Sequence, residues 1–262
     1  MRDAAAMLDC VSIPQPGDPF IIPKPDQPYA ALATQAPGKL RIGIVLDELL
    51  GIAVDPEVAA AVHATARTLA DMGHTVEMAK VEVDGAAMVR ATTDLFFFGF
   101  DLRLDGFAKR SGHKIGPDTL EPTILSIYEA AREITPARFI AANAAANTAR
   151  RSMGRFFTQH DIWLSPTTAR VSEPWGRYHL SKPGVGWHNL IAELFNAPCQ
   201  YTIPHNVMGT PAMSLPLAMH STGVPIGVQI AAKPAAEHLL LQLATALEAA
   251  LPWRDRRPPL HV

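Results

Sequence analysis

The chain has 262 residues, of which 48% are hydrophobic, and its formal net charge is −2. This composition provides enough apolar surface for a folded core and excludes disorder as the state of the whole chain. The near-neutral charge excludes an electrostatic surface for nucleic acid or an anionic membrane, and two isolated cysteines exclude a disulfide framework.

The beginning of the chain predicts a cytoplasmic protein. Asp3–Cys10 has the apolar spacing of a helix, and the apolar residues stop at Asp9, so the segment lacks the pattern of a signal peptide. No uninterrupted apolar run approaches the roughly 18 residues that a membrane span needs. Residues 14–37 contain seven prolines, which predicts an extended strap that lies on a surface.

Residues 40–83 predict a βαβ unit with parallel strands. Leu40–Leu46 is a short apolar run typical of a buried strand, and Thr75–Val83 alternates like a second strand. Between them, Asp55-Pro56-Glu57 combines a capping residue, a proline at the first helical position and an acidic first turn. No glycine-rich turn follows the first strand, which argues against a nucleotide site.

The middle of the chain predicts helices over Ala86–Phe107, Pro122–Ile134 and from Thr135-Pro136 to about Gln159. The aromatic residues in the first of these either pack in a core or line a pocket. Asp161–Ser165 is predicted to be a strand that Pro166 ends. Ser172–Gly186 is predicted to be a long surface loop and Trp187–Asn196 a helix.

Residues 206–230 predict a hairpin, with strands at Ala212–Met219 and Pro225–Ile230. Pro211 and Pro216 have no N–H to donate, so each should lie at a strand end or edge. Gly209 and Gly227 leave room for another backbone or a ligand. The hairpin is therefore either a supporting core element or the wall of a pocket. Residues 235–251 predict an amphipathic C-terminal helix.

Common catalytic motifs are missing from the sequence. It contains no Gly-x-Ser-x-Gly elbow, no His-Glu-x-x-His and no Cys-x-x-Cys, and its histidines are scattered. We therefore predict no metal site.

Several segments together resemble the C-terminal part of the amidase signature family. The clearest is Asn206-x-x-Gly209-x-Pro211-Ala212-x-Ser214-Leu215-Pro216, followed by Gly223-x-Pro225-x-Gly227-x-Gln229. Residues 2–19, 40–83 and 161–167 resemble further segments of the family in order. The tail, residues 252–262, is similar to that of the aminohexanoate cyclic-dimer hydrolase group. The resemblance implies an α/β fold with a mixed β-sheet flanked by α-helices, formed by residues 1–262 as a single domain.

The family hydrolyses carbon–nitrogen amide bonds with a Ser–Ser–Lys triad carried by a Gly/Ser-rich loop, and this chain has no matching loop. It contains no Gly-Gly and no Ser-Ser dipeptide, and its lysines lie in no similar motif. An activated serine needs a base within hydrogen-bond reach and donors for the oxyanion. The resemblance therefore implies the C-terminal half of an amidase whose N-terminal catalytic half is missing, and we predict no catalytic residue here. Because serine-based amide hydrolysis uses no cofactor, the resemblance implies none.

Three functional hypotheses follow. In the first, the chain is an amide hydrolase by descent that supplies a sheet and a pocket wall for a small-molecule amide. In the second, it is a non-catalytic partner that complements a separate N-terminal half or forms a homodimer. In the third, it is an unrelated α/β domain that binds a small molecule. If a pocket is shared, its predicted wall residues, each of which could instead be a packing residue, are Thr92, Asp94, Phe98, Cys199, Tyr201 and Asn206.

Overall fold

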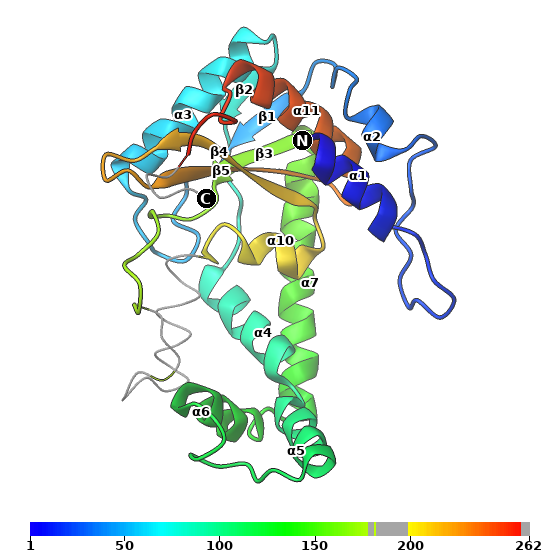
Figure 1. Ribbon diagram of the computed structural model, residues 1–262, viewed down its shortest axis with the longest axis vertical. Helices are drawn as coiled ribbons and strands as arrows, with labels where there is room; N and C mark the ends of the chain where they lie inside the picture. The colour runs from blue at the N-terminus through cyan, green and yellow to red at the C-terminus, as the bar shows by residue number, and fades with distance from the viewer. Residues whose placement is uncertain (178–180, 182–198, 258–262) are drawn as a thin grey trace.

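The computed structural model describes residues 1–177, 181 and 199–257, so most of the predicted loop 172–186 and all of the predicted helix 187–196 lie outside it. A five-stranded mixed sheet forms its centre (Figure 1). The strand order is β2-β1-β3-β5-β4; β2, β1 and β3 are parallel, and β5 is antiparallel to both β3 and β4. The predicted mixed α/β fold is confirmed. The strands are β1 (Arg41–Ile44), β2 (Thr75–Met78), β3 (Ile162–Pro166), β4 (Ala212–Met219) and β5 (Pro225–Ala232).

The parallel part of the sheet contains a βαβ unit made of β1, α3 (Pro56–Asp71) and β2. The Asp55 carboxylate accepts from the N–H groups of Glu57 and Val58, which begins α3 as its sequence predicts. The prediction that the second strand reaches Val83 is wrong. The neighbouring strand β1 ends at Ile44, whose carbonyl accepts from Ala79 N–H, and beyond it β2 has no partner.

Helices cover both faces of the sheet (Figure 1). On one face, α3 and α11 (Glu237–Ala250) pack on a core that includes Ile42, Leu164 and Ile230. On the other, the end of α7 (Pro136–Gln159) and the short α10 (Ile203–Met208) pack on Trp163 and Ala231. Successive side chains of a strand point to opposite faces of the sheet, so alternate residues of the same strands belong to the two cores.

A helical arm extends away from the sheet along α7 (Figure 1). It consists of α4 (Gly85–Phe97), α5 (Phe100–Ser111) and α6 (Pro122–Ala131), and α4 packs along α7. The sequence predicted one helical region over residues 86–107, whereas the structure has two helices. Gly99 adopts a left-handed conformation with φ of +70° between them, which an α-helix cannot continue.

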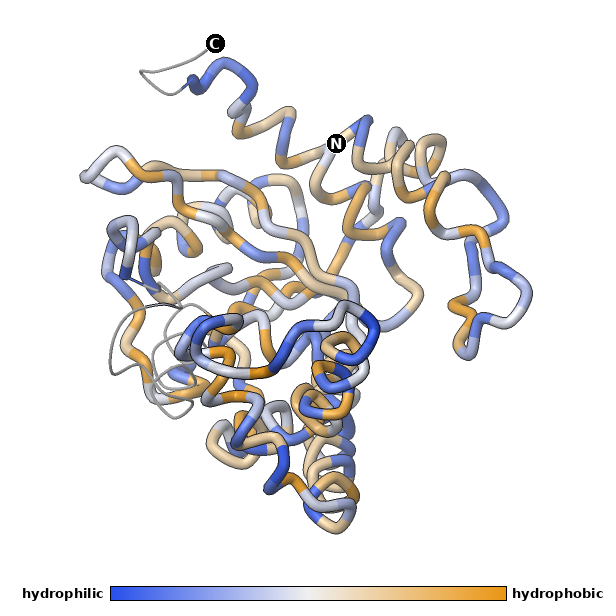
Figure 2. Tube along the Cα trace, turned by 60° about the horizontal axis from the view of Figure 1, so that its bottom comes forward, coloured by the Kyte–Doolittle hydropathy of each residue, from blue (hydrophilic) through white to orange (hydrophobic). Residues whose placement is uncertain are grey.

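The N-terminal segment comprises α1 (Arg2–Val11), a loop and the one-turn α2 (Tyr29–Leu32). The proline-rich segment is thus not extended throughout, because the Asp9 carboxylate accepts from the N–H groups of Tyr29 and Ala30 and fixes a helical turn there. The loop does not bury its apolar residues: Phe20 is 88% exposed, and Figure 2 shows a hydrophobic stretch at this place.

Strands β4 and β5 form the predicted hairpin, and Pro216 lies on an edge strand, within the register shift between Leu215 and Ala218. Residues 206–208 belong to α10, so the strand pair begins at Ala212.

In the part of the chain that the structure describes, no helix is long and apolar enough to cross a membrane.

Candidate functional site

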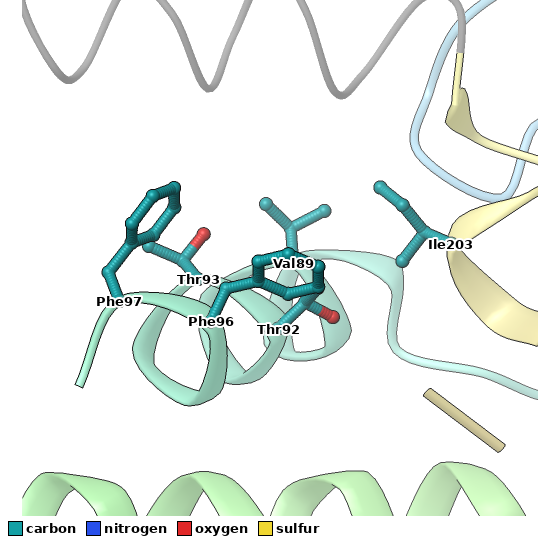
Figure 3. Close-up of a pocket in the computed structure, with 6 residues that line it drawn as sticks. All are labelled: Val89, Thr92, Thr93, Phe96, Phe97 and Ile203. Carbon is teal, nitrogen blue, oxygen red and sulfur yellow. The ribbon is translucent and has the colours of Figure 1, made fainter. Parts of the chain in front are cut away.

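A hollow lies between α4 and α10, and Figure 3 shows the side chains that line it. Its volume is only about 10 Å³, which is room for about one water molecule. Thr92 lines it and uses its hydroxyl to donate to the Met88 carbonyl, 2.8 Å away. Cys199 packs nearby on the cluster that contains Met88 and Ile203, and burial raises the pKa of its thiol. Its lining residues are Val89, Thr92, Thr93, Phe96, Phe97 and Ile203.

Asp94 and Phe98 contact α7 instead of this hollow. The Asp94 carboxylate accepts two bonds from the Arg138 guanidinium, the shorter of 2.6 Å. The Phe98 ring stacks on Phe139 with 4.5 Å between ring centroids. Both side chains therefore hold α4 on α7.

Tyr201 precedes α10 and Asn206 lies within it, and their surroundings differ. Tyr201 is fully buried, its hydroxyl donates to the Asp47 carbonyl at 3.1 Å, and burial raises the pKa of the phenol well above its ordinary value. Asn206 is exposed, and its amide donates to the Thr202 carbonyl. Of the six predicted wall residues, Thr92 alone is among the described lining of the hollow, and Cys199 packs on the cluster of Met88 and Ile203.

A buried glutamine pair that sequence reasoning missed fixes the segment around Tyr201. The Gln229 side chain, on β5, donates to the Tyr201 carbonyl at 2.9 Å. The Gln200 side chain donates to the Ile52 carbonyl and accepts from Leu50 N–H, which ties the loop after β1 to residues 199–201. The signal was present in the sequence, because Gln229 is the one polar residue within the apolar run Pro225–Ile230.

Gly227 adjoins a hydroxyl pair. Thr167 Oγ1 and Ser214 Oγ are 2.6 Å apart, and a Cβ at Gly227 would lie 2.8 Å from each. The close approach expected at Gly227 therefore comes from two side chains of this chain. Gly209 differs: it ends α10 with φ of +68°, and nothing lies within 4 Å of a Cβ placed there.

His205 of α10 is a buried neutral imidazole. Its Nδ1 lies 2.8 Å from Thr210 Oγ1, its ring meets Trp163 edge to face at 5.2 Å between centroids, and burial lowers its pKa to about 4. Its Nε2 has no hydrogen-bond partner within the described ranges.

The serines on this face of the sheet bond to neutral groups. Ser165 Oγ donates to the Pro166 carbonyl and accepts from Gln229, while Ser214 bonds to Thr167. Six lysines have a described position, and all six are exposed. Within residues 1–177, 181 and 199–257, no group of three His, Cys, Asp or Glu side chains is placed to hold a metal ion.

This fold is that of the amidase signature enzymes. The solved structure of a bacterial aryl acylamidase of that family matches 98% of this chain and 54% of its own, with a TM-score of 0.82 at 20% identity. The amidase family model matches residues 1–241, and the chain belongs to the amidase family.

Two curated relatives match nearly the whole chain. They are the 6-aminohexanoate-cyclic-dimer hydrolases of Pseudomonas sp. (strain NK87) and Paenarthrobacter ureafaciens, each 36% identical over 99% of this chain and 54% of its own length. A solved 6-aminohexanoate cyclic dimer hydrolase matches 98% of this chain and 55% of its own, with a TM-score of 0.88 and 33% identity. The chain thus spans about half the length of the curated relatives it matches.

Proposed function

We propose that this chain is one half of an amide hydrolase: it supplies the sheet and a wall of the substrate pocket, and the Ser–Ser–Lys triad is not among its residues. The observation that carries the proposal is the 36% identity over 99% of this chain and only 54% of each named hydrolase. Small-molecule amides are the proposed substrates, and the cytoplasm is the proposed location.

The proposed pocket wall is centred on Thr92 and Cys199, beside the hollow between α4 and α10. Asp94 and Phe98 contribute by holding α4 on α7, through Arg138 and Phe139. Tyr201 fixes the backbone next to Cys199 through its bond to Asp47. Asn206, on the exposed side of α10, completes the six proposed wall residues.

The proposed chemistry needs no cofactor. A serine of the other half attacks the amide carbonyl while a base takes its proton, the amine leaves with a proton, and water hydrolyses the resulting ester. Backbone or side-chain donors must hold the oxyanion. Ser165 and Ser214 are poor nucleophiles, because each bonds to a neutral group and no charged base is bonded to them.

Turnover measurements test this proposal. The purified chain is assayed on the 6-aminohexanoate cyclic dimer and on a linear amide, alone and after co-expression with the N-terminal half of the Paenarthrobacter ureafaciens hydrolase. We expect no turnover by the chain alone and measurable turnover by the pair. Turnover by the chain alone that Ser165→Ala or Ser214→Ala abolishes would contradict the proposal.

A second candidate function is that of a non-catalytic partner that complements a separate half or forms a homodimer. It is favoured by the unpaired outer edge of β4, since an open strand edge invites association. A pair that binds but does not hydrolyse any amide in the assay would favour this function over the first.

A further inference from the structure

Among the described residues the sheet has two outer strands, β2 and β4, and the edge of β4 lies beside a groove. The Pro211 carbonyl accepts from Ala232 on β5, whereas the Pro216 carbonyl accepts from the Arg256 guanidinium at 2.9 Å. Because a strand directs alternate residues to opposite neighbours, Met213 and Leu215 face β5, and the backbone groups of Ala212 and Ser214 face outward. Two residues of β4 therefore offer N–H and C=O groups for another strand.

A groove runs beside this edge. Its volume is about 820 Å³, and it lies between β4, the start of α1 and the segment after α11, with Ala4, Ser214 and Trp253 among its lining residues. The N-terminus and the segment after α11 both lie beside β4, because Met1 and Pro252 line this groove together with Met213. The groove is thus the space that a further strand would need.

Helix α1 presents apolar residues on two sides. Its inner side, with Ala5 and Leu8, packs on α2 and α11. On its outer side Met7 is 63% and Val11 67% exposed. An unpaired strand edge, together with exposed apolar side chains on a helix whose first residues line the same groove, resembles a domain core cut in two, which is the character of obligate interfaces.

A second copy of this chain fits the edge poorly. If two β4 strands paired antiparallel about their centres, the two Pro216 residues would meet near the symmetry axis, and neither has an N–H to donate. The solved hydrolase matches 98% of this chain but 55% of its own length, so a polypeptide with the remaining part of the fold is the better occupant.

We infer that the outer edge of β4 and the outer side of α1 form the docking surface for a β-strand of the polypeptide that supplies the other half of the amidase fold. The inference rests on the proposed function and names the surface that this function requires. Main-chain hydrogen bonds to Ala212 and Ser214 provide affinity, and the apolar side of α1 extends the contact.

Residue-resolved amide hydrogen exchange tests the surface on the wild-type chain. The probe is the N-terminal half of the Paenarthrobacter ureafaciens hydrolase, co-expressed with the full chain. We expect exchange of Ala212 and Ser214 to slow about tenfold or more in the pair, as for a newly formed hydrogen bond. Met213 and Leu215, which bond to β5, are the internal control and should be protected with and without the probe. Unchanged exchange at Ala212 and Ser214 would overturn the inference.

A matched pair of proline variants gives a second test. Ala212→Pro removes an outward N–H at the β4 edge. Met78→Pro removes one at the opposite edge, because Thr75 and Ala79 donate to β1 and Met78 faces away. We expect Ala212→Pro to weaken binding of the probe about tenfold and Met78→Pro to leave it unchanged. Thermal unfolding checks that each variant is folded.

The outcomes separate the inference from the proposed function. Turnover by the pair together with equal binding by Ala212→Pro and wild type overturns the docking surface alone. Failure of the wild-type pair to associate overturns both. Met7→Glu on the outer side of α1 should also weaken binding, whereas Met72→Glu, at the end of α3, should not.

Discussion

Two positions on the face of the sheet covered by α7 and α10 show how single residues shape this half-fold. Gly227 gives space to the Thr167–Ser214 hydroxyl pair, and His205 keeps an uncharged imidazole against Trp163. His205 is buried, whereas the hydroxyl pair beside Gly227 is exposed. Each makes a separate prediction for stability.

Gly227→Ala should destabilise the fold by about 1–3 kcal/mol, the usual cost of overpacking. A Cβ there would approach both hydroxyl oxygens to 2.8 Å, so at least one of the two side chains must shift and strain their hydrogen bond. Gly106→Ala is the control: it lies in α5, its Cβ would meet only Arg110 at 3.4 Å, and it should stabilise by about 0.5–1 kcal/mol. Chemical denaturation measures both, and equal effects would refute the close-approach explanation.

His205 should make stability fall in mild acid. Its folded pKa of about 4 lies below the ordinary value of 6.5, so the unfolded chain binds the proton more readily. The associated stability is complete above pH 6.5 and is lost as the pH falls towards 4. Between pH 7 and pH 4.5 the free energy of unfolding should drop by about 2 kcal/mol more in the wild type than in His205→Gln. Identical drops in the two proteins would show that His205 does not titrate in this way.

The packing of α4 on α7 determines which of the predicted wall residues can reach a ligand. The helical arm depends on α4 packing along α7, and the predicted wall residues Asp94 and Phe98 are engaged in that packing. Because they contact Arg138 and Phe139, their effect on any ligand is to position α4, whereas Thr92 lines the hollow directly.

A double-mutant cycle on Asp94 and Arg138 should give a coupling energy of about 1 kcal/mol. The Asp94 side chain is 14% exposed and accepts two hydrogen bonds from the guanidinium. The coupling energy of this pair should therefore exceed that of an ordinary surface ion pair. The pair Arg2–Asp3, with side chains 91% and 87% exposed, is the control and should show no measurable coupling. Equal coupling in the two cycles would contradict a structural role for Asp94.

Elements with strong local signals could be predicted from the sequence, and side-chain directions could not. Thr135 and Pro136 fix the start of α7, which spans Pro136–Gln159 as expected. Gly99 breaks the predicted helix over 86–107, because a glycine inside a helical pattern does not reveal its own φ. Asp94 and Thr92 are two residues apart, so they point to different sides of α4, and only the tertiary structure shows which side meets α7.

For the molecule as a whole, helices cover both faces of the sheet, whereas the outer edge of β4 has no neighbouring strand among the described residues. The chain belongs to the amidase family and spans about half of its relatives. Both cores are built within this chain, whereas the edge of β4 and the outer side of α1 remain uncovered. This combination fits the proposal that the chain is one half of a larger fold.

The most direct test of that account is to locate the reactive serine. The co-expressed pair is treated with a fluorophosphonate, which forms a covalent bond with an activated serine, and mass spectrometry identifies the labelled chain. The account predicts a label on a serine of the N-terminal half and none on this chain. A label on Ser165, Ser214 or any other serine of this chain would contradict it.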